Sequence, residues 1–349
     1  MLIVTILFFG LLLIASLPGL KFNTGNKVKL LDKNDTNFIR GISALFVLVA
    51  HYAIWVQANT NGINSIAYAL LSQLGGIGVL LFFFVSGYGI NESYSNKKID
   101  KTYLIKRFKG VYLPYIFTKY ILLIISLFFD MSLFTVRGVF SILLVPDWFI
   151  FVIILQYISY YLARKYFSRN SLVFCLIANI VFTIWFVITD KPIGWYNALW
   201  LFTFGIVVSM YQDKITTFIS KHKICYAFVC SFMFLAFGVV FALFKGAAFA
   251  NIFKPISGMF LSIAICCIFG LIKIDNFFSS WLGKRSLHIY IIHMFVWDIL
   301  LVYVFKSMSN EKFTILTILA TIISFVLTEI IYYVTTRLTN LIVPSSKTK

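Results

Sequence analysis

Long runs of apolar residues, separated by short polar segments, recur along the whole chain. Most of them approach the roughly twenty residues that an α-helix needs to cross the hydrocarbon core of a bilayer. The pattern predicts an all-α integral membrane protein, a bundle of about eleven transmembrane helices. The predicted spans are residues 2–20, 41–57, 67–91, 111–129, 140–163, 172–189, 196–211, 224–244, 252–271, 286–305 and 313–335.

The composition agrees with a chain that lies largely in lipid. Of 349 residues, 61% are hydrophobic and 12% are charged, against about 25% charged in a soluble domain; mean hydropathy is +0.94. The sequence indicates no soluble domain, internal repeat or low-complexity linker. The first run has a basic flank after it and no Lys or Arg before it, the reverse of a signal peptide, which indicates a retained span.

With eleven membrane crossings, Lys and Arg are distributed unevenly between the loops on the two sides of the membrane. If the loop after the first span is cytoplasmic, 23 of the 30 positive residues fall inside, 6 fall outside, and Lys119 lies within a span. Cytoplasmic loops are enriched in Lys and Arg, and one missed span would exchange the faces downstream. The asymmetry predicts the N-terminus outside and the C-terminus inside.

The formal net charge of +18 does not indicate a nucleic-acid-binding protein. The positive residues are spread over many short loops, and anionic lipid headgroups explain them better. All five cysteines fall in predicted spans without metal-ligand spacing or an extracellular pairing pattern. They are interpreted as small core residues, and no metal is expected. The spans show no dominant dimer motif, so the sequence leaves the oligomeric state open.

An ionisable pair in the second span is the strongest candidate for chemistry. Arg40 and His51 are eleven residues apart in RGISALFVLVAH, three helical turns plus about 20°, so both side chains lie on one face. Roughly 16 Å of helix separates them, which places His51 near mid-bilayer if Arg40 marks the surface. A neutral imidazole can take a proton from a hydroxyl, and Arg40 suits a phosphate. The alternatives are a His that packs between helices and an Arg that anchors the span.

Two further segments carry candidate groups. Ser86 lies in the inner half of the third span, in GGIGVLLFFFVSGYG, where the glycines allow close helix packing. The loop that follows carries Lys106, Arg107 and Lys109, which together can hold phosphates. Small residues in spans usually serve packing and cytoplasmic loops are usually basic, so neither segment alone identifies a site.

Ionisable residues recur in the last two predicted spans. His293 and Asp298 are five residues apart in the tenth, so they do not share a helical face, and each is a candidate to reach His51 across the bundle. Asp298 and Glu329, the latter in the last span, each need a partner or a proton. One ionisable residue in each of several helices is also typical of a proton-coupled transporter of a glycan or small molecule, the main alternative; a non-catalytic scaffold is a third.

Taken together, these segments resemble the membrane acyltransferase-3 family over about residues 38–340. Four anchors occur in the expected order, and a weaker aromatic match, Trp148 in PDWFI, falls between the third and the fourth. The anchors are Arg40 and His51 with ten residues between them, FFFVSGYG with Ser86 and Gly87, KRFKGVYLPY with Arg107 and Pro114, and LGKRSLHIYIIH with Gly283, Ser286, Tyr290 and His293.

The resemblance implies an O-acyltransferase that moves an acyl group, most often acetyl, from cytoplasmic acyl-coenzyme A to a hydroxyl of an extracytoplasmic polysaccharide or its lipid-linked precursor. His51 would act as general base or as transient acyl carrier. The family's setting is the bacterial cytoplasmic membrane. The implied catalytic set is His51, Arg40 and Ser86; the acyl-coenzyme A set is Arg40, Lys106, Arg107 and Lys109; supporting candidates are Tyr290, His293, Asp298, Trp148 and Glu329.

The resemblance also divides the chain. Residues 1–37 hold an extra span and a basic cytoplasmic loop, residues 38–340 form the acyltransferase-3-like domain, and residues 341–349 form a cytoplasmic tail. Gly110 stands where relatives often keep a second arginine, which shifts the expected phosphate contacts to the neighbouring basic residues. No duplicated motif relates two halves, as alternating access in a transporter usually requires. The sequence fixes neither the acyl group, acetyl or succinyl, nor the acceptor.

Overall fold

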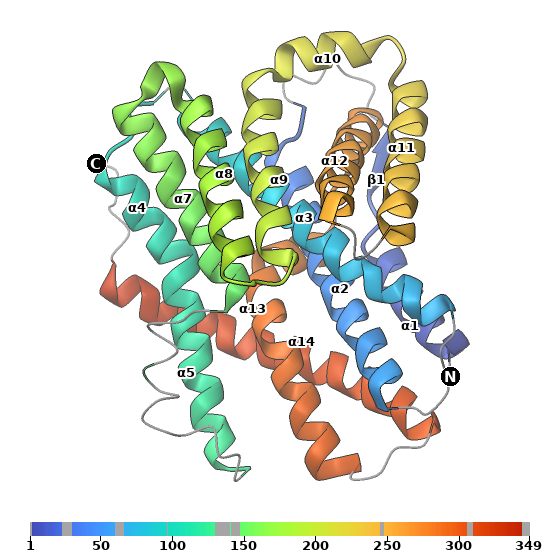
Figure 1. Ribbon diagram of the computed structural model, residues 1–349. Helices are drawn as coiled ribbons and strands as arrows, with labels where there is room; N and C mark the ends of the chain where they lie inside the picture. Colours follow the sequence, from blue (N-terminus) through green and yellow to red (C-terminus); the bar gives the residue numbers. More distant parts are fainter. Residues whose placement is uncertain are drawn as a thin grey trace.

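A computed structural model describes residues 2–22, 30–59, 66–95, 97–129, 140, 147–244, 248–305 and 310–343 (Figure 1). It is almost entirely helical, and each of the eleven apolar runs contains a helix. The first half comprises α1 (Leu2–Ala15), α2 (Lys33–Asn59), α3 (Ile66–Tyr94), α4 (Lys101–Arg107), the π-helix η1 (Phe108–Tyr112), α5 (Leu113–Leu127), α7 (Trp148–Tyr166), η2 (Ser168–Asn170) and α8 (Ser171–Ile188). The second half comprises α9 (Gly194–Met210), α10 (Gln212–Ser220), α11 (Lys223–Leu243), η3 (Ala248–Ile252), α12 (Phe253–Leu271), α13 (Phe277–Ile299), η4 (Leu300–Phe305) and α14 (Asn310–Ile342).

Eight helical segments in the described part of the chain are long and apolar enough to cross a membrane. The outer faces of the bundle are apolar as well: α11 exposes Phe228, Phe232, Leu235 and Leu243. Among the predicted spans that are not in this set of eight, the helix α1 has 14 residues and the helix α9 has 17. Fourteen residues span about 21 Å, less than the roughly 30 Å hydrocarbon core. The fold is that of a helical membrane protein, while the count of eleven crossings and the orientation stay predictions.

A two-stranded antiparallel sheet joins the loops after the first and ninth predicted spans. Strand β1 (Leu20–Phe22) pairs with β2 (Ile272–Ile274), with Lys21 opposite Lys273. The pairing places both loops on one face, as the charge distribution predicts. The sequence did not predict the sheet, because three residues are too few for an alternating pattern. Seven positive residues used for the orientation lie outside the described residues: Lys27, Lys29, Arg137, Lys245, Lys306, Lys347 and Lys349.

The centre of the bundle is built from α2, α3, α9 and α13 at glycine contacts. A Cβ on Gly87 of α3 would overlap the backbone of Phe202 in α9, and a Cβ on Gly205 of α9 would overlap that of Phe84. A Cβ on Gly283 of α13 would overlap the backbone of Asn37 in α2. Small residues let membrane helices approach this closely, so the FFFVSGYG and LGKRS glycines fix the helices that carry the candidate residues.

Polar side chains cap the N-termini of several helices around this centre. At the start of α2, the Asp32 carboxylate accepts hydrogen bonds from the backbone N–H of Asn34 and Asp35. Asn276 caps α13 by accepting from the Ser279 N–H at 2.7 Å, and its amide donates to the carbonyl of Ser16 beyond α1. Asp100 caps α4, where hydrogen bonds from Thr102 lower the pKa of its carboxyl. These caps fix where each helix enters the bundle.

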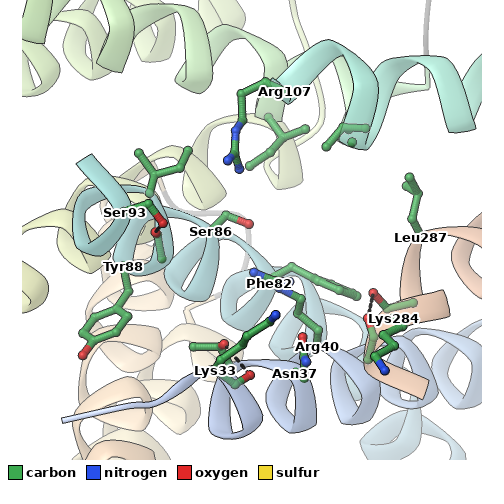
Figure 2. Close-up of a pocket in the computed structure, with 18 of the residues that line it drawn as sticks. Lys33, Asn37, Arg40, Phe82, Ser86, Tyr88, Ser93, Arg107, Lys284 and Leu287 are labelled. Atoms are coloured by element: carbon green, nitrogen blue, oxygen red, sulfur yellow. Dashed lines mark hydrogen bonds between the residues drawn. The ribbon is translucent and has the colours of Figure 1, made fainter. Parts of the chain in front are cut away.

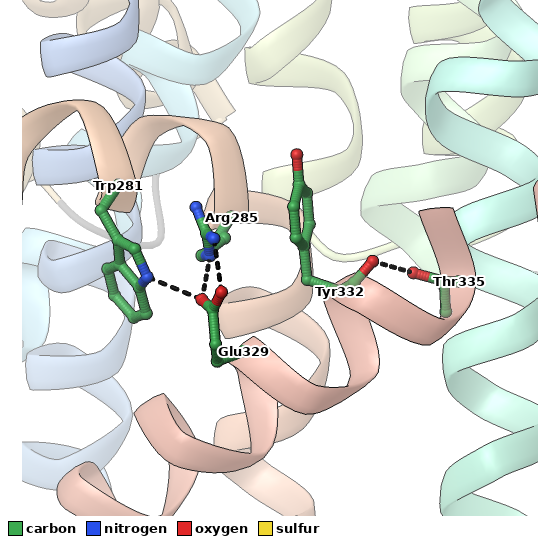
Figure 3. Close-up of polar contacts among 5 residues, drawn as sticks. All are labelled: Trp281, Arg285, Glu329, Tyr332 and Thr335. Carbon is green, nitrogen blue, oxygen red and sulfur yellow. Dashed lines mark hydrogen bonds and ion pairs between the residues drawn. The ribbon is translucent and has the colours of Figure 1, made fainter. Parts of the chain in front are cut away.

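The last helix, α14, crosses the bundle obliquely in Figure 1 and is joined to α13 by polar contacts. The Arg285 guanidinium pairs with the Glu329 carboxylate through two hydrogen bonds, and the Trp281 indole N–H donates to the same carboxylate at 2.7 Å (Figure 3). Further along, His288 Nε2 lies 2.9 Å from the Thr335 hydroxyl. Glu329 therefore has the partner that a carboxylate in a span needs.

Four of the five cysteines are buried, as expected for core residues. Cys225, in α11, is exposed and is the exception. Its position near the start of α11 puts it on a helix that packs mainly against α12, with most of its circumference open. Burial of a residue in an apolar run depends on the neighbouring helices and not on the run alone.

Candidate active site

A cavity of about 940 Å³ opens among α2, α3, α4, α7 and α13. This volume is near the upper end of the roughly 300–1,000 Å³ typical of small-molecule sites. Five basic side chains line what is called here the basic cavity, and Figure 2 shows Lys33 and Arg40 approaching it from α2, Arg107 from α4 and Lys284 from α13. They are Lys33, Arg40, Lys106, Arg107 and Lys284.

Arg40 and Lys33 reach the basic cavity from α2. Arg40 is half-buried, and a Cβ on Gly89 of the facing helix would lie 3.9 Å from its guanidinium. Lys33 lies seven residues earlier, two helical turns, and so shares the face of Arg40. That spacing is a signal in the sequence that could have added Lys33 to the candidate set. Lys284 was also missed; it follows Gly283 in the LGKRS segment.

Arg107 is held over the basic cavity by aromatic rings. Its guanidinium lies 5.7 Å from the ring centroids of both Tyr103 and Tyr157. Its Nε is buried and has no hydrogen-bond partner in the described part of the chain. In Figure 2 the guanidinium points into the cavity, across from Arg40 and Lys33. The geometry leaves donors available to an anion.

Lys109 takes no part in the lining of this cavity, although the sequence grouped it with Lys106 and Arg107. Its ammonium donates to the carbonyl of Val343 beyond α14, at 2.7 Å. The π-helix that begins at Phe108 changes the rotation between Arg107 and Lys109. Lys109 therefore faces the end of the chain, and the cavity's charge comes from the other basic residues.

Two acidic residues, Asp32 and Glu92, also line the basic cavity. Asp32 is engaged in capping α2. Glu92 accepts hydrogen bonds from the Ser209 hydroxyl at 2.9 Å and the Gln212 amide at 2.6 Å. Since basic residues outnumber acidic ones five to two, the cavity suits a ligand with several negative charges.

Ser86 and Tyr290 are two further residues that line the basic cavity. The Tyr290 ring packs on that of Phe149, with 4.9 Å between centroids. Tyr290 also lines a second cavity, of about 250 Å³, together with His51, Trp148 and Lys254. This second space is called here the small cavity. Tyr290 is thus a wall shared by two cavities, one strongly basic and one that contains His51.

His51 is oriented by His293, which lies 242 residues further along the chain. Nδ1 of His51 lies 2.7 Å from Nε2 of His293, and Nδ1 of His293 lies 2.8 Å from the carbonyl oxygen of Ile289. A carbonyl only accepts, so His293 carries its proton on Nδ1 and, when neutral, accepts at Nε2. His51 therefore donates from Nδ1 and keeps the lone pair on Nε2. This second nitrogen is the one able to take a proton or attack an acyl group.

The His pair also borders a much smaller void. His51 and His293 border a void of about 10 Å³ next to Thr321 and Ser324 of α14, which is room for about one water. Of these two spaces beside His51, the small cavity is the one with room for a substrate. Among the described residues, neither Asp298 nor Glu329 lines the basic cavity or the small cavity. Asp298 is half-buried beyond the pair, and Glu329 belongs to the α13–α14 contact (Figure 3).

The fold and site define a helical membrane protein with an internal site between two cavities. A sequence model of the acyltransferase-3 family, described as an acyltransferase domain, matches residues 34–335. The chain belongs to this family and is a membrane acyltransferase, which confirms the resemblance. The comparison with curated proteins gave no match, and neither did the comparison with solved structures. In the described residues no three His, Cys, Asp or Glu side chains are grouped to hold a metal.

Proposed function

We propose that this protein transfers an acyl group, acetyl in the first instance, from cytoplasmic acyl-coenzyme A to a hydroxyl of an extracytoplasmic saccharide. The acceptor is a surface polysaccharide or its lipid-linked precursor, and the setting is a bacterial cytoplasmic membrane. One observation carries the proposal: the basic cavity and the small cavity share Tyr290, and the small one contains the oriented base His51. An acyl donor in the basic cavity and an acceptor in the small cavity would therefore reach Tyr290 from opposite sides.

The basic cavity fits the donor by charge. Coenzyme A carries phosphate groups, and guanidinium groups bind phosphate through forked donors. Arg40, Lys33 and Lys284 on one side of the cavity, with Lys106 and Arg107 on the other, would hold these groups. Under the predicted orientation this end of the bundle is cytoplasmic, where acyl-coenzyme A is made. The thioester would then extend past Ser86 towards Tyr290.

Two chemical routes use the same nitrogen of His51. In the first, Nε2 takes the proton of the acceptor hydroxyl while the oxygen attacks the thioester carbonyl; the C–S bond breaks and the thiolate leaves with a proton. In the second, Nε2 attacks the carbonyl, the C–S bond breaks and coenzyme A leaves as the thiolate. The acceptor oxygen then attacks the acyl-imidazole, the C–N bond breaks to free Nε2, and the hydroxyl proton neutralises the thiolate. The hydroxyls of Ser86 and Tyr290 are candidate donors to the oxyanion in both.

The direct test is transfer of labelled acetyl from acetyl-coenzyme A to surface glycan, in membranes with and without this protein. Label in glycan that depends on the protein supports the proposal. If acetyl is not transferred, succinyl-coenzyme A is tested next. Failure with both donors, combined with flux of protons or glycan across the membrane, would favour a transporter instead.

Replacing His293 tests its role as a positioning residue. His293→Ala is expected to lower kcat about 10- to 100-fold, because His51 loses the contact that fixes its tautomer and ring position. The KM for acetyl-coenzyme A should not change, since His293 does not line the basic cavity. His293→Gln, whose side-chain oxygen can accept from His51 Nδ1, should recover part of kcat. A rise in KM with unchanged kcat would contradict this assignment.

Arg107 and Lys109 provide a matched pair for donor binding. Arg107→Gln is expected to raise the KM for acetyl-coenzyme A about tenfold with little change in kcat, because a bond to a charged group contributes about 1.5–3 kcal/mol. Lys109→Gln removes the same charge two residues away, outside the basic cavity, and should leave KM unchanged. Steady-state kinetics at several concentrations of acetyl-coenzyme A give the KM of each variant and so distinguish Arg107→Gln from Lys109→Gln. Equal effects would mean that general loop charge, and not the cavity, attracts the donor.

A further inference from the structure

The small cavity has a chemistry of its own, distinct from that of the basic cavity. Trp148 at the start of α7 and Gly194 at the start of α9 both line it, and a Cβ on Gly194 would approach the Trp148 indole within 3.6 Å. Its volume of about 250 Å³ is slightly below the roughly 300 Å³ at which pockets for drug-sized ligands begin. A single sugar residue fits such a space, and an indole face suits the apolar C–H face of a sugar ring.

Asn197 supplies a polar group that nothing in the described chain satisfies. It lines the small cavity from α9 and is 3% exposed, and its side-chain Nδ2 is buried without a hydrogen-bond partner among the described residues. A buried amide without a partner costs free energy unless a ligand or water accepts its hydrogens. Its position beside Trp148 and His51 makes a sugar oxygen a suitable acceptor.

Lys254 gives the small cavity its charge. Its ammonium lies at the wall beside Gly76, where a Cβ would approach it within 3.3 Å, and 5.4 Å from the Phe241 ring centroid. Of the described lining residues it is the one with a permanent charge. The carboxylate of Asp147, next to Trp148 in sequence, is paired with Lys119 at 2.9 Å. A lysine ammonium in the wall of a cavity is a donor that suits a carboxylate or a phosphate on a ligand.

We propose that the small cavity is an acceptor subsite selective for a sugar residue that carries an acidic group, a carboxylate or a phosphate. Trp148 packs against the ring, Asn197 donates to a ring substituent, and Lys254 binds the acidic group. The hydroxyl to be acylated then faces His51, which lines the same cavity. This inference rests on the proposed transfer to a saccharide and adds which class of saccharide is accepted.

The test measures binding without relying on catalysis. The full chain in nanodiscs of uncharged lipid is titrated with methyl glucuronide, glucose 1-phosphate and methyl glucoside, followed by saturation-transfer difference NMR. At least one acidic sugar is expected to bind about tenfold more tightly than methyl glucoside, the size expected for one charge-assisted hydrogen bond; which one binds best identifies the acidic group. Lys254→Met should abolish the preference, and Asn197→Leu should weaken all three.

Controls separate this inference from the proposed function. Lys191→Met removes a charge in the loop just before Gly194, outside the small cavity, and should leave the preference intact. Equal binding of all three sugars to the unmodified chain, or a preference that survives Lys254→Met, would overturn the subsite. An acid preference that depends on Lys254 in a chain that transfers no acyl group would support the subsite while refuting the proposed function.

Discussion

His51→Ala is expected to abolish acyl transfer, lowering the rate by about 10²–10⁴-fold if His51 is the general base. The reason is geometric: His51 lines the small cavity, and its hydrogen bond to His293 through Nδ1 leaves the lone pair on Nε2. The measurement is label transfer from acetyl-coenzyme A to glycan, at equal amounts of inserted protein. The same variant separates the two routes when the acceptor is left out. Label that becomes bound to the unmodified protein, but not to the His51→Ala protein, indicates the acyl-imidazole.

The matched control is another histidine of the same chain. His222 is exposed between α10 and α11 and lines neither cavity, so His222→Ala should transfer at the unmodified rate. A His51→Ala protein that inserts normally and acylates at full rate would refute the proposed chemistry. If the variant instead lost proton or substrate flux, the transporter reading would replace it.

Gly87→Val is expected to prevent correct packing of α3 against α9. The Cβ alone would overlap the carbonyl oxygen of Phe202 and lie 2.8 Å from its carbonyl carbon. Both belong to the backbone, so the helices must separate, and the cost should reach at least the upper end of the 1–3 kcal/mol typical of overpacking. The measurement is thermal stability of the detergent-solubilised protein, followed by size exclusion after heating.

Gly89→Ala is the control in the same helix. Its Cβ would meet only the end of the Arg40 side chain, at 3.9 Å, an ordinary contact. It should leave the thermal midpoint close to that of the unmodified protein. If both substitutions destabilise alike, the close approach of α3 and α9 does not determine the effect.

Much of the site's framework could be predicted from local sequence. The co-facial placement of Arg40 and His51 follows from helical periodicity over eleven residues, and the structure puts each of them beside a cavity. The glycines around Ser86 predicted close packing, which the contact with Phe202 bears out. Such features depend on one helix or on residue types, so they can be read without knowing the neighbours.

Other parts of the site depended on relations that no local pattern contains. Lys109 seemed equivalent to Arg107 in sequence, yet the π-helix after Arg107 turns it towards Val343. Asp298 and His293 were equal candidates to reach His51, and the rotation of α13 brings only His293 within hydrogen-bond distance. Sequence spacing gives the angle between two side chains on one helix, but not the direction in which that helix faces.

The sequence by itself determined that this chain is a helical membrane protein of the acyltransferase-3 family. It also determined that Arg40 and His51 lie on one face of a helix. Only the tertiary structure decided that His293 orients His51, that Glu329 binds Arg285, and that two cavities share Tyr290. The physical reason is that hydrophobicity and periodicity act along the chain. Helix rotation and partners are set by close contacts between segments hundreds of residues apart, such as Gly283 against Asn37.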